Sequence, residues 1–336
     1  MALPIRPSPA TPMRILHAPY RPVAGGRVSR ATRAANARPK QGRDSMQSVV
    51  GIVGLGIMGG AMACNLVAAG WRVIGFDTEP QRRAEAAADG VEAAESLADL
   101  VGEAPTILTS LPSPQAAVAV AEGIAASAPG RRVVIETSTL ALDDKLAVER
   151  ILAAAGHVVL DCPLSGTGAQ ARTRDLVVYA SGDAAEIERH RPLFDGFARR
   201  TENLGAFGNG SRMKFVANLL VAIHNVASAE AMVLGMKAGL DPDQVVALVG
   251  AGAGSSRVFE LRAPMMAENR YEPATMRLGT WAKDMAVIGA FAKALGCPTP
   301  LLDATQPIYD AASAERAAED TAAVCAVLEK MAGVER

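Results

Sequence analysis

The sequence is poor in cysteine, with four residues among 336: Cys64, Cys162, Cys297 and Cys325. They lie far apart and include no Cys-x-x-Cys pair, which excludes both a disulfide framework and a zinc knuckle. Such sparse, unpaired cysteines are typical of a protein in a reducing compartment.

Histidine is equally scarce, and none of the four residues stands at a metal-ligand spacing from another histidine or from an acid. His157 opens an expected strand and His190 lies in a polar helical window, so we interpret both as structural. His224 follows Lys214 by ten residues in one helical window, almost three turns away and too far for a direct proton relay. The sequence therefore predicts no metal site.

Long apolar runs are also missing, since no segment has the length and purity of a secretory or transmembrane segment. The nearest candidate, residues 215–236, is broken by polar side chains such as Asn218, Asn225 and Glu230. We interpret it as a buried helix of a globular domain and expect no membrane partner. We find no internal repeat and no coiled-coil heptad.

The net charge is small, at −1, but it is unevenly distributed. Residues 1–45 hold eight arginines, Lys40 and seven prolines against one acid, Asp44. This segment has no sustained apolar period, so we expect it to be disordered. Its arginines resemble those of a mitochondrial transit peptide, whereas its prolines oppose the amphipathic helix of such a peptide, and initiation at Met46 is the alternative. We expect a cytoplasmic protein, or a mitochondrial-matrix protein if residues 1–45 are a transit peptide, and no nucleic-acid surface in the remainder.

From Val49 onward, short β-branched runs alternate with longer alanine-rich helical windows, which is the pattern of a doubly wound parallel sheet. The runs are apolar on both faces, as strands covered by helices on both sides must be. The expected strands span residues 49–53, 73–76, 106–108, 133–135, 158–160 and 176–179.

After Gly210 the strand signal ends and only helical windows follow. They lie at about residues 211–238, 241–249, 276–295 and 300–318. The sequence therefore predicts an α/β fold in three parts: a disordered basic leader at 1–45, a Rossmann-type NAD-binding domain at 46–209 and an all-helical C-terminal domain at 210–333.

Three glycines form a Gly-x-Gly-x-x-Gly turn between the first expected strand and the first helical window. Gly54 permits the tight turn, Gly56 lets a pyrophosphate approach the backbone, and Gly59 lets the helix pack closely on the strand. Asp77 ends the next strand, where its carboxylate can accept hydrogen bonds from ribose hydroxyls and would repel a 2′-phosphate. We therefore predict NAD as the cofactor, while the arginines at 82–83 are close enough to admit NADP as well.

The glycine turn is the first of a series of motifs that follow one another along the chain. They are Gly-Ile-Val-Gly-Leu-Gly-Ile-Met-Gly at 51–59, Ser-Leu-Pro at 110–112, Thr-Ser-Thr at 137–139, Asp-Cys-Pro-Leu-Ser-Gly-Thr at 161–167, Gly-Asn-Gly at 208–210 with Lys214 and Asn218 after it, and Lys283-Asp284. In this order they resemble the β-hydroxyacid dehydrogenase family, which includes 3-hydroxyisobutyrate dehydrogenase, tartronate semialdehyde reductase and L-threonate dehydrogenase. The resemblance spans about residues 46–330.

The resemblance implies a role for each of these motifs. In the family a Rossmann domain is joined by a long helix to an all-helical domain, and the cofactor lies against the Rossmann domain. The residues implied to contact the cofactor are Gly54, Gly56, Ile57, Met58, Gly59, Asp77, Leu111, Pro112, Thr139 and Lys283. Those implied to bind substrate are Ser165, Gly166, Thr167 and Asn218, and Lys214 is the implied catalytic residue.

Oxidation of an alcohol by hydride transfer needs a group that takes the hydroxyl proton, and Lys214 is our candidate. Desolvation and neighbouring positive charge would favour its neutral amine, which is the form that acts as a base. Asn218 lies four residues later on the same expected helix, so both side chains leave one face. We therefore predict an NAD-dependent oxidoreductase that interconverts a small β-hydroxy acid and its semialdehyde or keto form, assembled as a homodimer or homotetramer.

Three positions depart from the family pattern, since Thr167 and Arg174 replace glycines and Ala217 replaces the first of two asparagines. We hypothesise that Arg174 recognises a second anionic group on the substrate. Two other functions stay open. One is an imine-reductase-like enzyme, a group that generally lacks the lysine matching Lys214, and the other is a noncatalytic dinucleotide-binding module.

Overall fold

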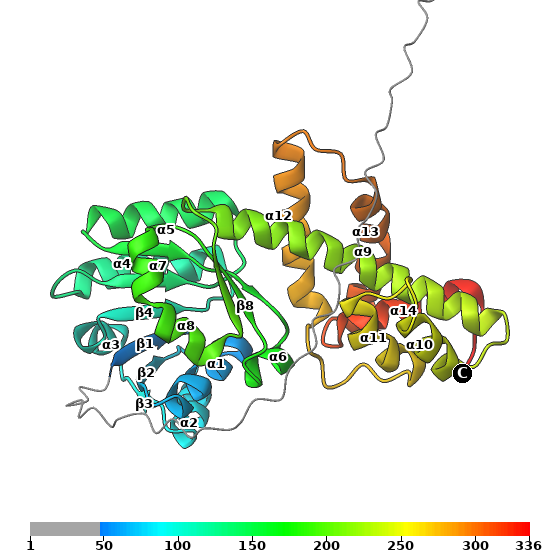
Figure 1. Cartoon of the computed structure of the whole chain (residues 1–336), viewed down its shortest axis with the longest axis horizontal. Coiled ribbons are helices and arrows are strands. Elements are labelled where there is room, and N and C mark those ends of the chain that lie inside the picture. The colour runs from blue at the N-terminus through cyan, green and yellow to red at the C-terminus, as the bar shows by residue number, and fades with distance from the viewer. Residues whose placement is uncertain (1–47) are drawn as a thin grey trace, which may run out of the picture. The chain divides into compact units, whose positions relative to one another are not determined.

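The computed structural model describes residues 48–336, so the disorder expected for residues 1–45 lies outside the described residues. The first half of this region contains a six-stranded parallel sheet in the order β3-β2-β1-β4-β5-β6 (Figure 1). Because the order reverses between β1 and β4, a crevice forms beyond the carboxyl ends of these two strands. The strands are β1 (Val49–Val53), β2 (Arg72–Phe76), β3 (Glu92–Ala93), β4 (Thr106–Thr109), β5 (Val133–Glu136) and β6 (Val158–Asp161).

Helices cover both faces of this sheet and bury a separate apolar core on each. Ile52 and Leu108 face one core and Ile107 faces the other, and all three are fully buried, as the apolar runs predict. The Rossmann-type fold expected from the sequence is thereby confirmed. The helices are α1 (Ile57–Ala68), α2 (Pro80–Ala88), α3 (Leu97–Glu103), α4 (Pro114–Ser127), α5 (Leu142–Ala154), α6 (Gly168–Arg172), α7 (Ala184–Arg189) and α8 (Arg191–Phe197).

The sixth strand of the sheet is not the expected one. Residues 176–179 were predicted for that place, but they fall in β8 (Val177–Ala180), which belongs to a separate three-stranded sheet. There β8 pairs antiparallel with β7 (Leu164–Ser165) and parallel with β9 (Arg200–Asn203). The sixth strand is β3, whose two residues are exposed, so that no apolar pattern in the sequence could reveal it.

The 29-residue helix α9 (Asn209–Lys237) opens the helical part of the chain. By length and composition it could cross a membrane, yet 44% of its most apolar window is buried, because it forms the core of the helical part. Helix α11 was not expected, since Pro264 within it interrupts the helical pattern, and neither was the short α14. The other helices are α10 (Pro242–Gly250), α11 (Arg257–Ala267), α12 (Leu278–Ala294), α13 (Pro300–Arg316), the 3₁₀ turn η1 (Thr321–Ala323) and α14 (Val324–Ala332).

Candidate active site

The glycine turn between β1 and α1 is shaped by three different constraints. Gly54 has a φ of +91°, and a Cβ there would lie 2.2 Å from the carbonyl oxygen of Ser110. A Cβ on Gly59 would lie 1.8 Å from the carbonyl oxygen of Gly54, so α1 can approach the strand only without a side chain here. At Gly56 the nearest neighbour is Nη1 of Arg82, 3.6 Å away. Its missing side chain leaves open space before the N-terminus of α1, which is the space a pyrophosphate needs.

Asp77 follows β2 directly and is only 6% exposed. Its Oδ2 accepts a hydrogen bond from the N–H of Leu55 at 2.8 Å, and its Oδ1 accepts one from the N–H of Glu79 at 2.9 Å. Nη1 of Arg82 lies 3.5 Å from Oδ2, and Arg83 donates to the carbonyl oxygen of Asp77 at 2.7 Å. The carboxylate of Asp77 therefore holds the backbone of the glycine turn at Leu55, and the guanidinium groups of Arg82 and Arg83 lie close to Asp77.

The loops that follow β4 and β5 are tied together at the same end of the sheet. The N–H of Leu111, beside the exposed Pro112, donates to Oγ of Ser138 at 2.8 Å. The carbonyl oxygen of Thr139 accepts a hydrogen bond from Nζ of Lys283 at 2.7 Å. This second bond joins α12 of the helical part to a loop of the sheet, so the expected nicotinamide end of the cofactor site is built from both parts.

The first turn of α1 carries the two apolar residues of the glycine motif. Ile57 is 54% exposed, and a Cβ added at Gly168 would lie 2.4 Å from its Cγ2. The glycine turn thus meets the segment that follows β7 at this side chain. Met58 instead packs on the apolar core beneath α1.

Lys214, Asn218 and Asp284 form a buried polar cluster between α9 and α12, with exposed fractions of 7%, 4% and 5%. Nδ2 of Asn218 donates to Oδ2 of Asp284 at 3.1 Å, and Oδ1 of Asp284 lies 3.7 Å from Nζ of Lys283. Burial lowers the pKa of Lys214; the carboxylate of Asp284 opposes this shift, and the ammonium of Lys283 adds to it. Burial also raises the pKa of Asp284, against the effect of both lysines. The cluster therefore favours a lysine amine that gives up its proton more readily than one in water.

Lys214 and Asn218 line a cavity of about 980 Å³ together with Ser165, Gly166 and Thr167. These five residues come from α9 and from β7 with its following loop, about 50 residues apart in the chain. The structure thus brings the predicted proton-transfer group and the predicted anion-binding loop to one cavity. Its volume suits a small organic molecule with room to spare.

Other residues of this cavity were not predicted as site residues. They include His224 of α9, Ser255 and Ser256 of the turn before α11, Arg257 of α11 and Trp281 of α12. No local spacing links these segments, because only the packing of α11 and α12 on α9 brings them together. Arg174 is exposed with a φ of +59°, and the arginines that line the cavity are instead Arg199, Arg257 and Arg262.

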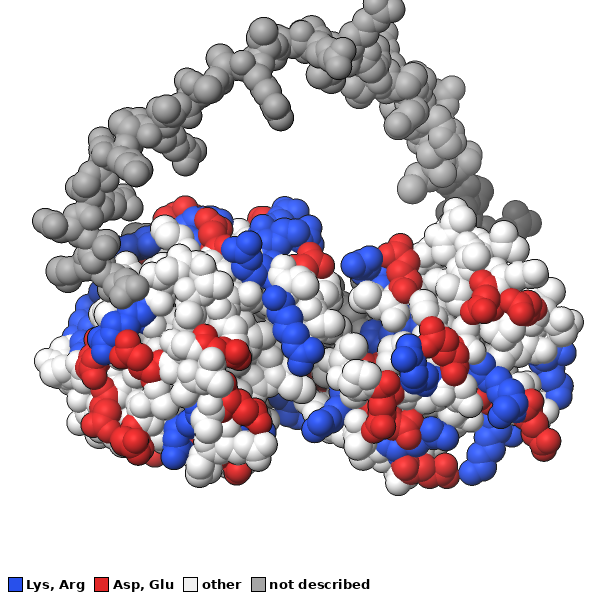
Figure 2. All heavy atoms as spheres, turned by 90° about the horizontal axis from the view of Figure 1, so that it is seen from below, with Lys and Arg blue, Asp and Glu red and all other residues white. Residues whose placement is uncertain are grey.

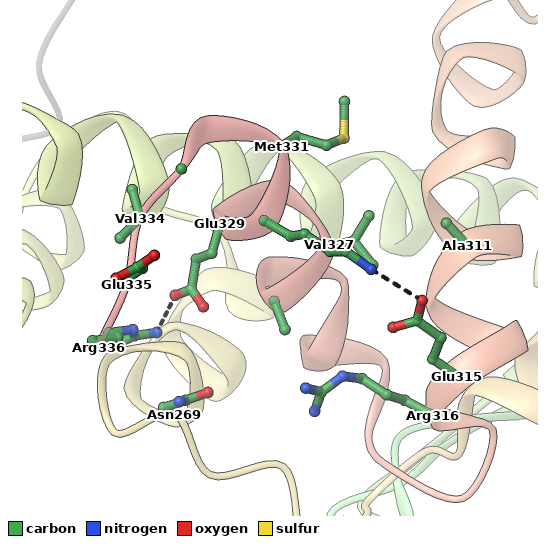
Figure 3. Close-up of a pocket in the computed structure, with 13 residues that line it drawn as sticks. Asn269, Ala311, Glu315, Arg316, Val327, Glu329, Met331, Val334, Glu335 and Arg336 are labelled. Atoms are coloured by element: carbon green, nitrogen blue, oxygen red, sulfur yellow. Dashed lines mark hydrogen bonds and ion pairs between the residues drawn. The ribbon is translucent and has the colours of Figure 1, made fainter.

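A second cavity, of about 560 Å³, lies among α13, α14 and the last residues of the chain (Figure 3). Four of its charged side chains form two ion pairs: Glu329 pairs with Arg336, and Glu315 lies 3.3 Å from Lys330. None of the predicted site residues lines it. Five of the predicted site residues line the cavity at Lys214 instead.

Charged side chains of both signs are interspersed on the face shown in Figure 2. Nucleic-acid-binding proteins usually carry a continuous basic stripe or patch, whereas the basic side chains on this face alternate with acidic ones. Within residues 48–336, no three histidine, cysteine, aspartate or glutamate side chains are grouped so that they could hold a metal ion.

Comparison with protein families matches the two parts of the chain separately. Residues 49–205 match the model described as the NAD binding domain of 6-phosphogluconate dehydrogenase. Residues 208–328 match the model described as NAD-binding of NADP-dependent 3-hydroxyisobutyrate dehydrogenase. The two matches meet within a few residues of the start of α9.

Individual relatives agree with these matches. An L-threonate dehydrogenase from Cupriavidus necator is 33% identical over 83% of this chain and 95% of its own length. A 3-hydroxyisobutyrate dehydrogenase from Pseudomonas aeruginosa is 30% identical over 75% of this chain and 88% of its own. The solved structure of a Mycobacterium tuberculosis 3-hydroxyisobutyrate dehydrogenase with L-serine has a TM-score of 0.77 at 29% identity, covering 84% of this chain and 99% of that one.

An imine reductase from Streptomyces aurantiacus is also similar in structure, with a TM-score of 0.56 at 21% identity, which shows a shared fold and no more. The homologous dehydrogenases and the two family matches establish a nicotinamide dinucleotide as the cofactor and a CH–OH group as the site of oxidation or reduction. The chain is a member of the β-hydroxyacid dehydrogenase family.

Proposed function

We propose that this chain interconverts a small β-hydroxy acid and its semialdehyde or keto form, with Lys214 as the general acid and base. The main support is the position of the Lys214 side chain, which is 7% exposed and lines the cavity shared with Ser165–Thr167. Burial lowers its pKa, which increases the fraction of neutral amine at a given pH. In the oxidising direction the neutral amine takes the hydroxyl proton, and in the reducing direction the ammonium returns it.

We propose that the substrate carboxylate is bound by the hydroxyls of Ser165 and Thr167 and by backbone N–H groups of this loop, including that of Gly166. Asn218 lies one helical turn beyond Lys214 and its amide is held by Asp284, so its orientation is defined before a substrate arrives. The names of the relatives, L-threonate dehydrogenase and 3-hydroxyisobutyrate dehydrogenase, support a small hydroxy acid.

We propose that the cofactor lies in the crevice where the strand order reverses, with its pyrophosphate in the open space at Gly56. When bound, it supplies the acceptor or donor of the hydride. Asp77 favours NAD, while Arg82 at 3.5 Å from its carboxylate reduces the repulsion that a 2′-phosphate would meet. The proposed contacts are Gly54, Gly56, Ile57, Met58, Gly59 and Asp77 toward the adenosine and pyrophosphate, and Leu111, Pro112, Thr139 and Lys283 toward the nicotinamide.

We also propose that the NAD-binding domain ends at residue 209 and that the helical domain begins at residue 210. We further propose that the chain assembles as a homodimer or homotetramer. Large apolar side chains of α9 are exposed in the single chain, among them Val216 (55%), Leu220 (48%) and Leu234 (72%), and a second copy would cover them. Light scattering of the purified protein measures the assembly. A cytoplasmic location stays a prediction, because it depends on residues 1–45.

The substitution Lys214→Ala tests the central claim. With 3-hydroxyisobutyrate or L-threonate and NAD, we expect kcat to fall about a thousandfold, because general acid–base catalysis is removed. Affinity for NADH, followed by its fluorescence, should stay close to that of the unmodified protein. Lys237→Ala is the matched control, since it removes an exposed lysine from the last turn of the same helix and should leave kcat unchanged.

Each alternative predicts a different result. Undiminished turnover by Lys214→Ala would contradict the role of this lysine. Reduction of cyclic imines in place of hydroxy-acid oxidation would support an imine-reductase-like enzyme. Cofactor binding by the unmodified chain without turnover of any of these compounds would support a noncatalytic dinucleotide-binding module.

A further inference from the structure

Lys145, in the first turn of α5, is among the largest side chains of the described residues that are fully buried. Its Nζ contacts the carboxylate of Glu136 and lies 3.0 Å from Oδ1 of Asp161. Glu136 and Asp161 are the last residues of the adjacent strands β5 and β6 and face each other in the sheet register. One buried ammonium thus bridges the carboxyl ends of two neighbouring strands. These ends lie on the side of the sheet where we propose that the cofactor binds.

On one side, this bridge holds the loops proposed to contact the cofactor. Oε1 of Glu136 accepts a hydrogen bond from the N–H of Ser138 at 3.0 Å. Oγ of Ser138 in turn accepts the N–H of Leu111 at 2.8 Å. The positions of the loops after β4 and β5 therefore depend on the carboxylate that Lys145 neutralises.

On the other side, the bridge holds the start of the helix that carries Lys214. Oδ2 of Asp161 accepts the N–H of Ser211 at 2.8 Å, and Oδ1 accepts the hydroxyl of the same serine at 2.9 Å. Ser211 precedes Lys214 by three residues, so it lies under the same turn of α9. A carboxylate at this place also interacts favourably with the positive end of the helix dipole.

Burying three charged side chains costs desolvation free energy, which is unfavourable for an element that has only a structural role. Burial alone lowers the pKa of Lys145, but Glu136 and Asp161 more than reverse this shift, so the lysine is buried as a cation. Buried ion pairs of this kind contribute little more to stability than well-packed apolar residues of the same volume. What an apolar side chain could not provide is a directed link to two carboxylates that each hold a different half of the active site.

We propose that Lys145 is a positioning residue for hydride transfer, which fixes the loops at Leu111 and Ser138 relative to the first turn of α9 and hence relative to the amine of Lys214. The proposal depends on the function proposed for Lys214. A misplacement of reacting groups by about 1 Å can cost about a hundredfold in rate. Loss of the link should therefore lower kcat far more than it changes the affinity for the hydroxy acid.

The test compares Lys145→Met with Leu152→Ala, which removes a fully buried apolar side chain from the same helix. We expect Lys145→Met to lower kcat about tenfold to a hundredfold with 3-hydroxyisobutyrate or L-threonate and NAD, with a change in KM for the hydroxy acid of less than about threefold. Amide hydrogen exchange without cofactor should accelerate at residues 136–140 and 209–214. Leu152→Ala should lower the melting temperature but leave kcat and exchange in both segments unchanged.

The double variant Lys145→Met with Glu136→Gln separates positioning from stability, because glutamine removes one of the two buried carboxylate charges that the single variant leaves without a cation, and it can still accept the N–H of Ser138. We expect it to regain thermal stability but not kcat, and it replaces the single variant if that variant does not fold. Recovery of kcat together with stability would overturn the proposal, as would native exchange in both segments of Lys145→Met. The exchange measurement needs no turnover, so it distinguishes failure of this proposal from failure of the role of Lys214.

Discussion

Nζ of Lys283 donates a hydrogen bond to the carbonyl oxygen of Thr139 at 2.7 Å, across 144 residues of chain. The same ammonium lies 3.7 Å from Oδ1 of Asp284 and lowers the pKa of Lys214. Lys283 therefore combines a mechanical role, joining α12 to the loop after β5, with an electrostatic role at the amine proposed to transfer the proton.

Lys283→Met should shift the pH profile of hydroxy-acid oxidation toward higher pH. The reason is that the ammonium of Lys283 lowers the pKa of Lys214, so its removal raises that pKa and the neutral amine forms only at higher pH. The dependence of kcat/KM on pH measures the shift. If the rising part of the plot of kcat/KM against pH did not move, Lys283 would have no effect on the pKa of the group that titrates.

Asp284→Asn should shift the rising part of the same pH profile toward lower pH. The carboxylate of Asp284 raises the pKa of Lys214, so replacing it with a neutral amide lowers that pKa and extends oxidation to lower pH. The double variant Lys283→Met with Asp284→Asn is the control, because its two effects have opposite signs and should largely cancel. A shift toward higher pH in Asp284→Asn would contradict the assignment of this rising part to Lys214.

Gly56→Ala should impair cofactor binding without unfolding the protein. An alanine Cβ at this position meets no protein atom closer than 3.6 Å, so it occupies the open space proposed for the pyrophosphate. We expect NADH affinity, measured by fluorescence titration, to fall at least about tenfold, or about 1.4 kcal/mol.

Gly59→Ala provides the contrast to Gly56→Ala. Its Cβ would lie 1.8 Å from a backbone oxygen, so it should lower stability by about 1–3 kcal/mol in urea unfolding. Normal NADH affinity in Gly56→Ala would show that no phosphate group passes this glycine.

Arg82→Ala should narrow cofactor use toward NAD. The guanidinium of Arg82 is 3.5 Å from the carboxylate of Asp77 and is half exposed, so it can meet a 2′-phosphate there. Without it, we expect kcat/KM with NADP to fall about tenfold while kcat/KM with NAD changes little. Gln81→Ala, a neutral change at the preceding position of α2, should affect neither cofactor. Equal losses with both cofactors would assign Arg82 to the pyrophosphate.

Features that depend on neighbouring residues in the chain could be read from the sequence. The glycine turn is one, because tight turns and helix starts are set by local backbone geometry, and the strands of the Rossmann core are another, because burial on both faces leaves an unbroken apolar run. The shared face of Lys214 and Asn218 follows from four-residue spacing on a helix. Strand β3 is the exception, since its two exposed residues carry no pattern.

The sequence by itself determined the fold class, the glycine turn between β1 and α1, and the helix that carries the lysine amine, because each follows from local periodicity or local backbone freedom. Only the tertiary structure decided which charges are buried together. In the sequence, Lys145 follows two aspartates at a helix start and resembles a solvated side chain, yet it is fully enclosed. Likewise Asp284 meets Asn218 across 66 residues. Burial of a charge depends on partners that long-range packing supplies, and no spacing along the chain records them.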